Sequence, residues 1–168
     1  MAELDFYCPL WRLDRFLSRD IFSLRLVLNQ TNRGTNMSIP LMCIALLGFL
    51  GIGLGFAVSS LRVRNDVVYG SSNDPEDILH KTLRAHGNTM EYAPFLALLI
   101  YILGQSQQPA WVIWCMVLVT ISRYSFAIGM IFPKTLAKRN PPRLLGAMGT
   151  YIFGLGLCVA LLIQVLNV

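Results

Sequence analysis

The sequence predicts an all-α integral membrane protein built as a four-transmembrane-helix bundle. Composition is the first reason: 55% of the 168 residues are hydrophobic and 14% are charged, whereas soluble domains average about 25% charged residues. The second reason is that four stretches reach the roughly 20 mostly apolar residues that a membrane-spanning helix requires. Only helices and closed barrels satisfy their backbone polar groups inside a bilayer. These stretches are too long and continuous for barrel strands, so helices are expected.

The four expected helices follow one another along the chain. They are predicted at about residues 38–61, 78–103, 109–132 and 143–166. The first is almost purely apolar, whereas the second is polar over its first half. Asp74, followed by Pro75 and Glu76, predicts the start of the second helix, because Asp caps helices and Pro and acids favour the first turn. Pro94 predicts a kink that opens space beside the polar side chains of this helix.

Membrane topology accounts for the formal net charge of +5. The connections at 62–77 and 133–142 lie on one side of the membrane and hold Arg62, Arg64, Lys134, Lys138 and Arg139. The remaining connection, at 104–108, and the C-terminus hold no Lys or Arg. The positive-inside rule then predicts cytoplasmic basic loops, a C-terminus on the far side, and tryptophans 111 and 114 at the far interface. No basic patch is interleaved with exposed aromatic residues, so no nucleic-acid partner is expected.

Residues 1–37 fit this topology badly, because they carry five arginines on the side predicted for the C-terminus. We expect an N-terminal extension that is either disordered or an artefact of an upstream start, with Met37 as the natural start. An amphipathic surface helix over residues 15–28 is the alternative. Acidic residues argue against a mitochondrial transit peptide, and a signal-peptide core is missing.

Polar residues at bilayer depth carry the expected chemistry, because burying them costs several kcal/mol. Four of them are spaced to lie on one face of the second helix: His80, Arg84, Asn88 and Glu91. Arg123 lies at similar depth in the third helix, so we predict an ion pair between Glu91 and Arg123. A stripe that only holds helices together is the alternative for these two. For Arg84 we favour a bound anion.

Two further sets of residues are interpreted structurally. Small residues in the first and fourth helices are expected to permit close helix contact: Gly51, Gly55, Gly146, Gly149 and Gly154. The four cysteines lack ligand spacing and a disulfide framework, so no metal site is expected. Arg143 opens the fourth helix at the cytoplasmic edge, where an arginine taken alone is more often a snorkelling residue.

Two segments resemble the motifs of a known family. RAHGNTMEYAPF, residues 84–95, is similar to the signature of the MAPEG superfamily, membrane-associated proteins in eicosanoid and glutathione metabolism. That signature is an Arg, an Asn four residues on, a Glu three further, and then a Pro. SRYSFAIGM, residues 122–130, is similar to the third-helix motif of the family. The resemblance covers residues 38–168, which we expect to form one MAPEG-like domain, and the bacterial-type members look closest.

The resemblance implies a homotrimer in a bacterial inner membrane, with glutathione as cofactor bound between neighbouring subunits near the cytoplasmic side. The positions that hold glutathione or brace its site match Arg84, Asn88, Glu91 and Arg123. Arg143 matches the arginine that stabilises the glutathione thiolate. Arginines suit the carboxylates of glutathione, and a nearby cation lowers the pKa of a thiol. Membrane lipid and a lipophilic small-molecule substrate are the other implied partners.

The sequence departs from the family at four positions: His80, Gly87, Phe126 and Met130. Met130 replaces a tyrosine and His80 an acid, which argues against prostaglandin or leukotriene synthesis. The expected function is a membrane-embedded glutathione-dependent transferase or peroxidase acting on lipophilic electrophiles. The alternative is a non-catalytic lipid-binding or scaffold member. A third hypothesis, a small transporter with Glu91 as its proton site, is disfavoured because no internal repeat is evident.

Overall fold

Four α-helices make up the part of the chain that the computed structural model describes, residues 38–166. They are the Ser38–Arg64 helix, α2 (Ile78–Gly104), α3 (Ala110–Ile131) and α4 (Pro141–Leu166). No strand occurs within this range, so the predicted all-α bundle is confirmed. The expectations for residues 1–37 lie outside the described residues.

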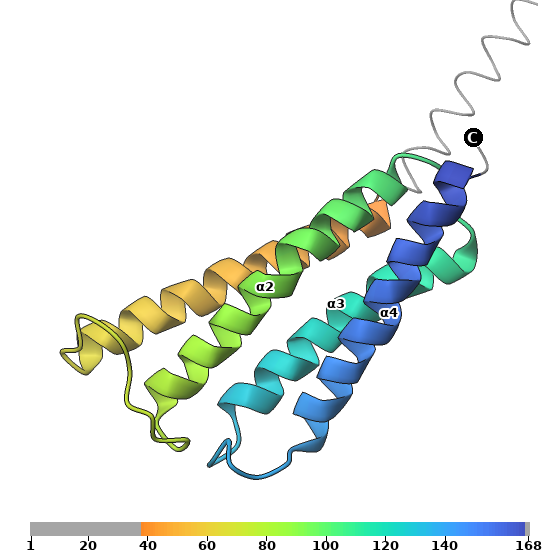
Figure 1. Cartoon of the computed structure of the whole chain (residues 1–168). Helices are drawn as coiled ribbons and strands as arrows, with labels where there is room; N and C mark the ends of the chain where they lie inside the picture. The colour runs from red at the N-terminus through yellow and green to blue at the C-terminus, as the bar shows by residue number, and fades with distance from the viewer. Residues whose placement is uncertain (1–37, 167–168) are drawn as a thin grey trace, which may run out of the picture. The chain divides into compact units, whose positions relative to one another are not determined.

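The helices alternate in direction, and the two longer connections meet at one end of the bundle (Figure 1). There the backbone N–H of Leu136, in the α3–α4 connection, donates a hydrogen bond of 3.0 Å to the carbonyl of Pro75, which precedes α2. Trp111 and Trp114 lie in the first turns of α3, at the opposite end. The basic connections therefore share one end of the bundle, as the charge pattern predicted.

Three of the described helices are long and apolar enough to cross a membrane, namely the Ser38–Arg64 helix, α3 and α4. Their outer surfaces remain apolar, with Phe49, Ile52 and Leu155 largely exposed, and exposed apolar areas of this kind mark membrane contact. α2 has 27 residues, or about 40 Å at about 1.5 Å per residue. Its length suffices, but charged residues in its first half lower its apolar content.

α2 begins after Asp77, not after Asp74 as the sequence predicted. Asp77 is the N-cap, and its carboxylate accepts a 3.0 Å hydrogen bond from the N–H of Leu79. Asp74 accepts a hydrogen bond from the N–H two residues on, in a local turn. The carbonyl of Pro75 accepts from Leu136, so it does not accept from Leu79 as it would inside a helix. Contact with the α3–α4 connection therefore accompanies the later helix start.

Two other boundaries differ from the prediction. The first helix runs past its expected end at Leu61, so that Arg62 and Arg64 lie in its last turn, where cations complement the helix dipole. α4 begins at Pro141 rather than at Arg143, in keeping with the preference for proline in the first turn of a helix. Arg143 is therefore a first-turn residue of α4.

The buried core consists of two apolar clusters. The larger cluster receives side chains from all four helices, for example Leu47, Ile100, Met116 and Leu157. The smaller cluster joins the first three described helices and consists of Leu50, Leu54, Ala85, Phe126, Ala127 and Met130. Because α3 contributes to both clusters, its polar residues are held among the other helices rather than at the surface.

Glycines allow α3 and α4 to approach until their backbones touch. A Cβ at Gly146 would lie 2.7 Å from the carbonyl oxygen of Ser122, and a Cβ at Gly129 would lie 2.7 Å from the Cα of Arg143. Gly149 faces the side chain of Ser122 in the same way. The close contact expected at Gly146 and Gly149 is confirmed, and Gly129 adds to it from α3.

Gly51 and Gly55 face side chains of α2 rather than its backbone. A Cβ at Gly51 would lie 3.2 Å from the sulfur of Met90, and one at Gly55 would lie 3.2 Å from Cε1 of His86. Both distances are shorter than an ordinary van der Waals contact, so the expected close helix contact is formed, against the side chains of Met90 and His86 rather than against backbone. Gly154 of α4 has only an ordinary van der Waals contact.

We expect Gly146→Ala to lower the free energy of unfolding by about 1–3 kcal/mol, because overpacking at a rigid contact forces the two helices apart. Gly53→Ala is the matched control, since nothing lies within 4 Å of a Cβ at that position. Thermal unfolding of both variants in the same detergent would measure the difference. Equal melting temperatures would contradict the close contact between α3 and α4.

The pKa of Asp77 lies below its usual value, chiefly because the hydroxyl of Ser72 donates a 2.7 Å hydrogen bond to its carboxylate. A pKa depressed by folding adds stability above the unfolded-state pKa, and this stability is lost as the pH falls through the folded-state pKa. Asp77→Asn keeps a capping oxygen but does not titrate. Its melting temperature should therefore fall less than that of the wild type between about pH 7 and about pH 3. If the melting temperatures of the two proteins fell by the same amount over this pH range, Asp77 would make no contribution to the pH dependence of stability.

Candidate functional site

Arg123 is the most deeply buried charged side chain among the described residues, with 1% of its surface exposed. Its Nη2 donates hydrogen bonds of 2.9 Å to Oδ1 of Asn88 and 3.4 Å to Oγ1 of Thr89, both on α2. The guanidinium carbon lies 5.2 Å from the ring centroid of Tyr92 and 5.1 Å from that of Phe126. Cations at such distances over aromatic faces are stabilised by the ring quadrupole. Neutral oxygens and aromatic rings therefore surround the charge.

The predicted ion pair between Glu91 and Arg123 is not formed. Glu91 is exposed on α2, and within the described structure the two side chains share no hydrogen bond or ion pair. Helical geometry explains the difference, because Asn88 faces α3 while Glu91 lies about 60° further around α2, toward the outer surface. Within residues 38–166, Nε of Arg123 is buried without a hydrogen-bond partner, and no carboxylate forms an ion pair with the guanidinium.

A small cavity of about 20 Å³ lies beside Arg123 and Asn88. Tyr92 of α2 and Tyr151 of α4 line it, with their hydroxyl oxygens 3.2 Å apart. Their rings meet edge to face, with centroids 5.9 Å apart. The cavity therefore combines one cation, one amide and three hydroxyl groups, a donor-rich set with room for about one water-sized polar group.

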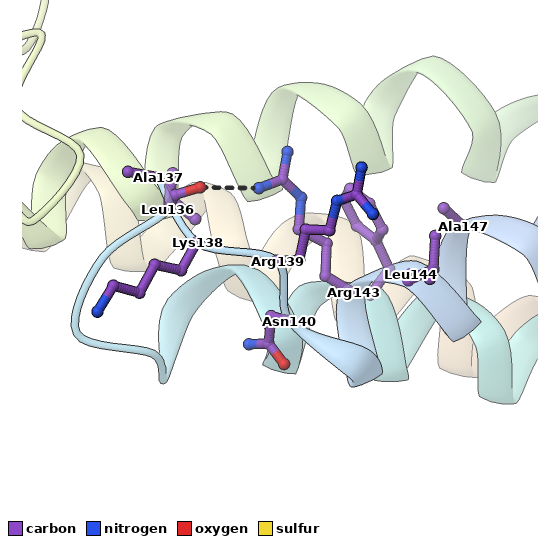
Figure 2. A pocket seen from close by; sticks show the side chains of 9 residues that line it. Leu136, Ala137, Lys138, Arg139, Asn140, Arg143, Leu144 and Ala147 are labelled. Carbon is purple, nitrogen blue, oxygen red and sulfur yellow. Dashed lines mark hydrogen bonds between the residues drawn. The ribbon is translucent and has the colours of Figure 1, made fainter.

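A larger cavity of about 660 Å³ lies at the basic end of the bundle, where Arg143 lines it together with the α3–α4 connection (Figure 2). Nη1 of Arg143 donates a 3.3 Å hydrogen bond to the carbonyl of Leu136. Phe126 and Ala147 line both this cavity and the smaller one beside Arg123. The two spaces therefore share a wall, and volumes of roughly 300–1,000 Å³ are typical of small-molecule sites.

The predicted site residues thus occupy three environments. Asn88 and Arg123 are in contact, and Arg143 lines the larger cavity. Arg84 and Glu91 are exposed on the outer face of α2, and neither makes a hydrogen bond or ion pair within residues 38–166. His80, the first residue of the predicted stripe, lies with Nδ1 3.3 Å from the hydroxyl of Ser71. The residues predicted to form one polar face on α2 therefore do not form a single site, because the packing of α2 places them in different surroundings.

Lys81 was missed by the sequence reasoning, although it is buried and joins two helices. Its Nζ donates hydrogen bonds of 2.9 Å to the carbonyl of Pro133 and 3.5 Å to that of Lys134. These carbonyls follow the end of α3, where a cation is favoured by the helix dipole. The helical period could have revealed it, because Lys81, Ala85 and Thr89 share one face, and all three are buried.

Met130 stands where the resemblance to the MAPEG superfamily implies a tyrosine. Its side chain is buried in the smaller apolar cluster with Leu50 and Leu54 of the first helix and Phe126 of α3. No hydroxyl could be supplied from this position. Tyr92 and Tyr151, which the sequence did not single out, instead bring hydroxyl groups to the cavity beside Arg123.

The MAPEG family model matches residues 40–163, so this chain belongs to the MAPEG family. The match covers all four described helices nearly completely and includes every predicted site residue. No curated protein matches the chain. Family membership and three long apolar helices identify an integral membrane protein of a family active in glutathione and eicosanoid metabolism.

We expect Asn88→Ala to destabilise the protein by about 1–3 kcal/mol, because it removes a hydrogen-bond acceptor from a buried cation. Glu91→Gln should change stability by less than about 0.5 kcal/mol, as surface substitutions usually do. Thermal unfolding in dilute detergent would compare the two variants. A larger loss of stability in Glu91→Gln than in Asn88→Ala would indicate that Glu91 and Arg123 do form an ion pair.

Proposed function

We propose that this protein is a membrane-embedded glutathione-dependent transferase or peroxidase that acts on lipophilic electrophiles. The observation that carries the proposal is the buried guanidinium of Arg123, which has neutral partners and an unpartnered Nε beside a donor-rich cavity. Burial of a charge without an opposite charge is costly. A site of this kind is therefore best explained by an anionic ligand, and glutathione is the ligand associated with the family.

The side chains of this site fit glutathione, which carries two carboxylates, one ammonium group and a thiol. Arg84 on the outer face of α2 binds a carboxylate, since arginine matches carboxylate geometry, and Glu91 on the same face binds the ammonium group. Asn88 and Arg123 brace the site from behind. Bound glutathione supplies a nucleophilic sulfur, and Arg143 favours the thiolate because a nearby cation lowers the pKa of a thiol.

A homotrimer is part of the proposal, because the site on α2 is open in one chain. Glu91 lies about 20 Å along α2 from its start, at a depth where lipid surrounds an isolated bundle. Exposure of Arg84 and Glu91 to lipid would cost several kcal/mol. A neighbouring subunit that covers this face removes the cost and encloses a ligand between subunits.

The orientation that we propose places the basic end of the bundle in the cytoplasm of a bacterial cell, with the inner membrane as its location. The Lys and Arg residues of the two longer connections support it through the positive-inside rule. Glutathione then reaches the site from the cytoplasm, while a lipophilic electrophile reaches it from the bilayer. The two reactants meet at the face of α2 that carries Arg84 and Glu91, and neither crosses the whole membrane.

A non-catalytic lipid-binding role is the second candidate, and one observation favours it. An apolar groove of about 200 Å³ lies between the Ser38–Arg64 helix and α2. Pro94 lines this groove, so the space expected beside it opens toward the first helix and not toward Arg84 and Glu91. Met130 points to the same role, because a methionine buried among apolar side chains cannot supply the hydroxyl group of the tyrosine that the resemblance implies at this position.

Calorimetry with glutathione on the purified full-length protein tests the proposal. We expect a Kd between about 1 μM and about 1 mM, and loss of binding in Arg84→Ala. Arg84 makes no hydrogen bond or ion pair within the described residues, so this variant should melt close to the wild-type temperature. Lys134→Ala, which removes a cation from the α3–α4 connection, is the matched control. No binding to the wild type would favour the lipid-binding role.

Arg143→Ala separates thiol activation from binding. Glutathione affinity and the melting temperature should stay close to wild type, while conjugation to a lipophilic electrophile should fall by at least about tenfold, the effect of about one unit in thiol pKa. The rate should also become more dependent on pH, because the thiolate then forms at higher pH. Full activity in Arg143→Ala would assign thiol activation to another cation.

A further inference from the structure

The cavity at the basic end carries cations that the proposed thiol site does not use. Lys138 and Arg139 line it together with Arg143. In Figure 2 the side chains of Arg139 and Arg143 extend in the same direction, while Lys138 extends away from them. No acidic side chain lines the cavity. Cations that share a space repel one another, so the cavity favours an anion.

Neither Lys138 nor Arg139 makes a hydrogen bond or ion pair within residues 38–166, and both are exposed. Arg143 donates only to the carbonyl of Leu136. Two arginines with free donors match a phosphate group, because each guanidinium presents a planar fork of N–H groups. The polar half of the cavity therefore has the chemistry of a phosphate site.

The other half of the cavity is apolar and lies where α3 and α4, two helices apolar enough to cross a membrane, meet their connection. Leu136, Leu144, Phe126 and Ala147 line it. Leu144 is 60% exposed and lies in the first turns of α4, one of the helices apolar enough to cross a membrane. The lining thus changes from cationic to apolar in the direction in which a bilayer changes from head groups to acyl chains. A small soluble anion would make no contact with the apolar half of the cavity.

Hydrogen bonds hold the walls of this cavity in place. Nδ2 of Asn140 donates to the carbonyl of Gly129 at 3.1 Å, and the hydroxyl of Ser125 donates to the carbonyl of Pro142 at 3.1 Å. The N–H of Leu136 is bonded to the connection before α2. A loop fixed by several contacts loses little freedom when a ligand binds, and such preorganisation favours affinity.

We propose that this cavity binds the phosphate head group of an anionic phospholipid from the surrounding membrane. Arg139 and Arg143 contact the phosphate, and the first acyl carbons lie against Leu136 and Leu144. Basic pockets at the membrane surface are suited to such head groups. The site goes beyond the proposed thiol chemistry and shares only Arg143 with it, so the test leaves Arg143 unchanged.

The test uses the purified full-length protein in a neutral detergent and measures binding of phosphatidylglycerol and phosphatidylcholine by native mass spectrometry. The wild type should retain phosphatidylglycerol in preference to phosphatidylcholine. Arg139→Gln should bind phosphatidylglycerol about fivefold more weakly, as expected for one arginine at a membrane surface. Lys134→Gln is the matched control, because it removes the same charge from the same loop without lining the cavity.

Three outcomes would overturn the proposal. An equal loss in Lys134→Gln would show attraction to the general charge of the loop. Equal binding of glycerol 3-phosphate would assign the site to a soluble anion. Complete release of phosphatidylglycerol by glutathione would assign the cavity to the thiol ligand. Glutathione binding in lipid-free detergent is measured separately, so a failure of the lipid proposal is distinguishable from a failure of the proposed function.

Discussion

The burial of one positive charge is the constraint on which the polar interior of this bundle depends. Arg123 can lie at the centre of the helices only because Asn88 and Thr89 offer oxygens and Tyr92 and Phe126 offer ring faces. These partners come from two helices, so the charge fixes how α2 sits against α3. A buried charge without an opposite charge is among the most costly features in a protein, which is why we propose an anionic ligand for this site.

The contact between α3 and α4 determines where the remaining cations lie. Gly129 and Gly146 bring the two helices within backbone contact, and Gly149 faces the side chain of Ser122. Lys81 binds the carbonyls that follow α3, and the bond from Leu136 to Pro75 ties the same connection to the start of α2. The result is a basic cavity at one end of the bundle whose walls are held by these hydrogen bonds.

Much of the fold could be predicted from the sequence, because membrane-spanning helices are recognisable from their long runs of apolar residues. A bilayer requires long apolar runs and internally bonded backbone, and these rules located all four described helices. The N-cap of α2 was predicted at Asp74 instead of Asp77, because Pro75 contacts a distant connection that no local rule contains. The close contact of Gly146 with α3 was also predictable, since small residues at helical spacing allow close packing. The close contact of Gly129 with α4 was not, because it depends on Gly129 facing the backbone of Arg143.

For the candidate site, the sequence by itself determined which polar residues lie at membrane depth and that Asn88 and Arg123 belong to a family motif. Only the tertiary structure decided their partners. Residues three or four apart share a helix face, but whether Asn88 or Glu91 faces α3 depends on the rotation of α2, which the core of the bundle sets. The same rotation buries Lys81 and exposes Arg84, because packing, not spacing, chooses the buried side.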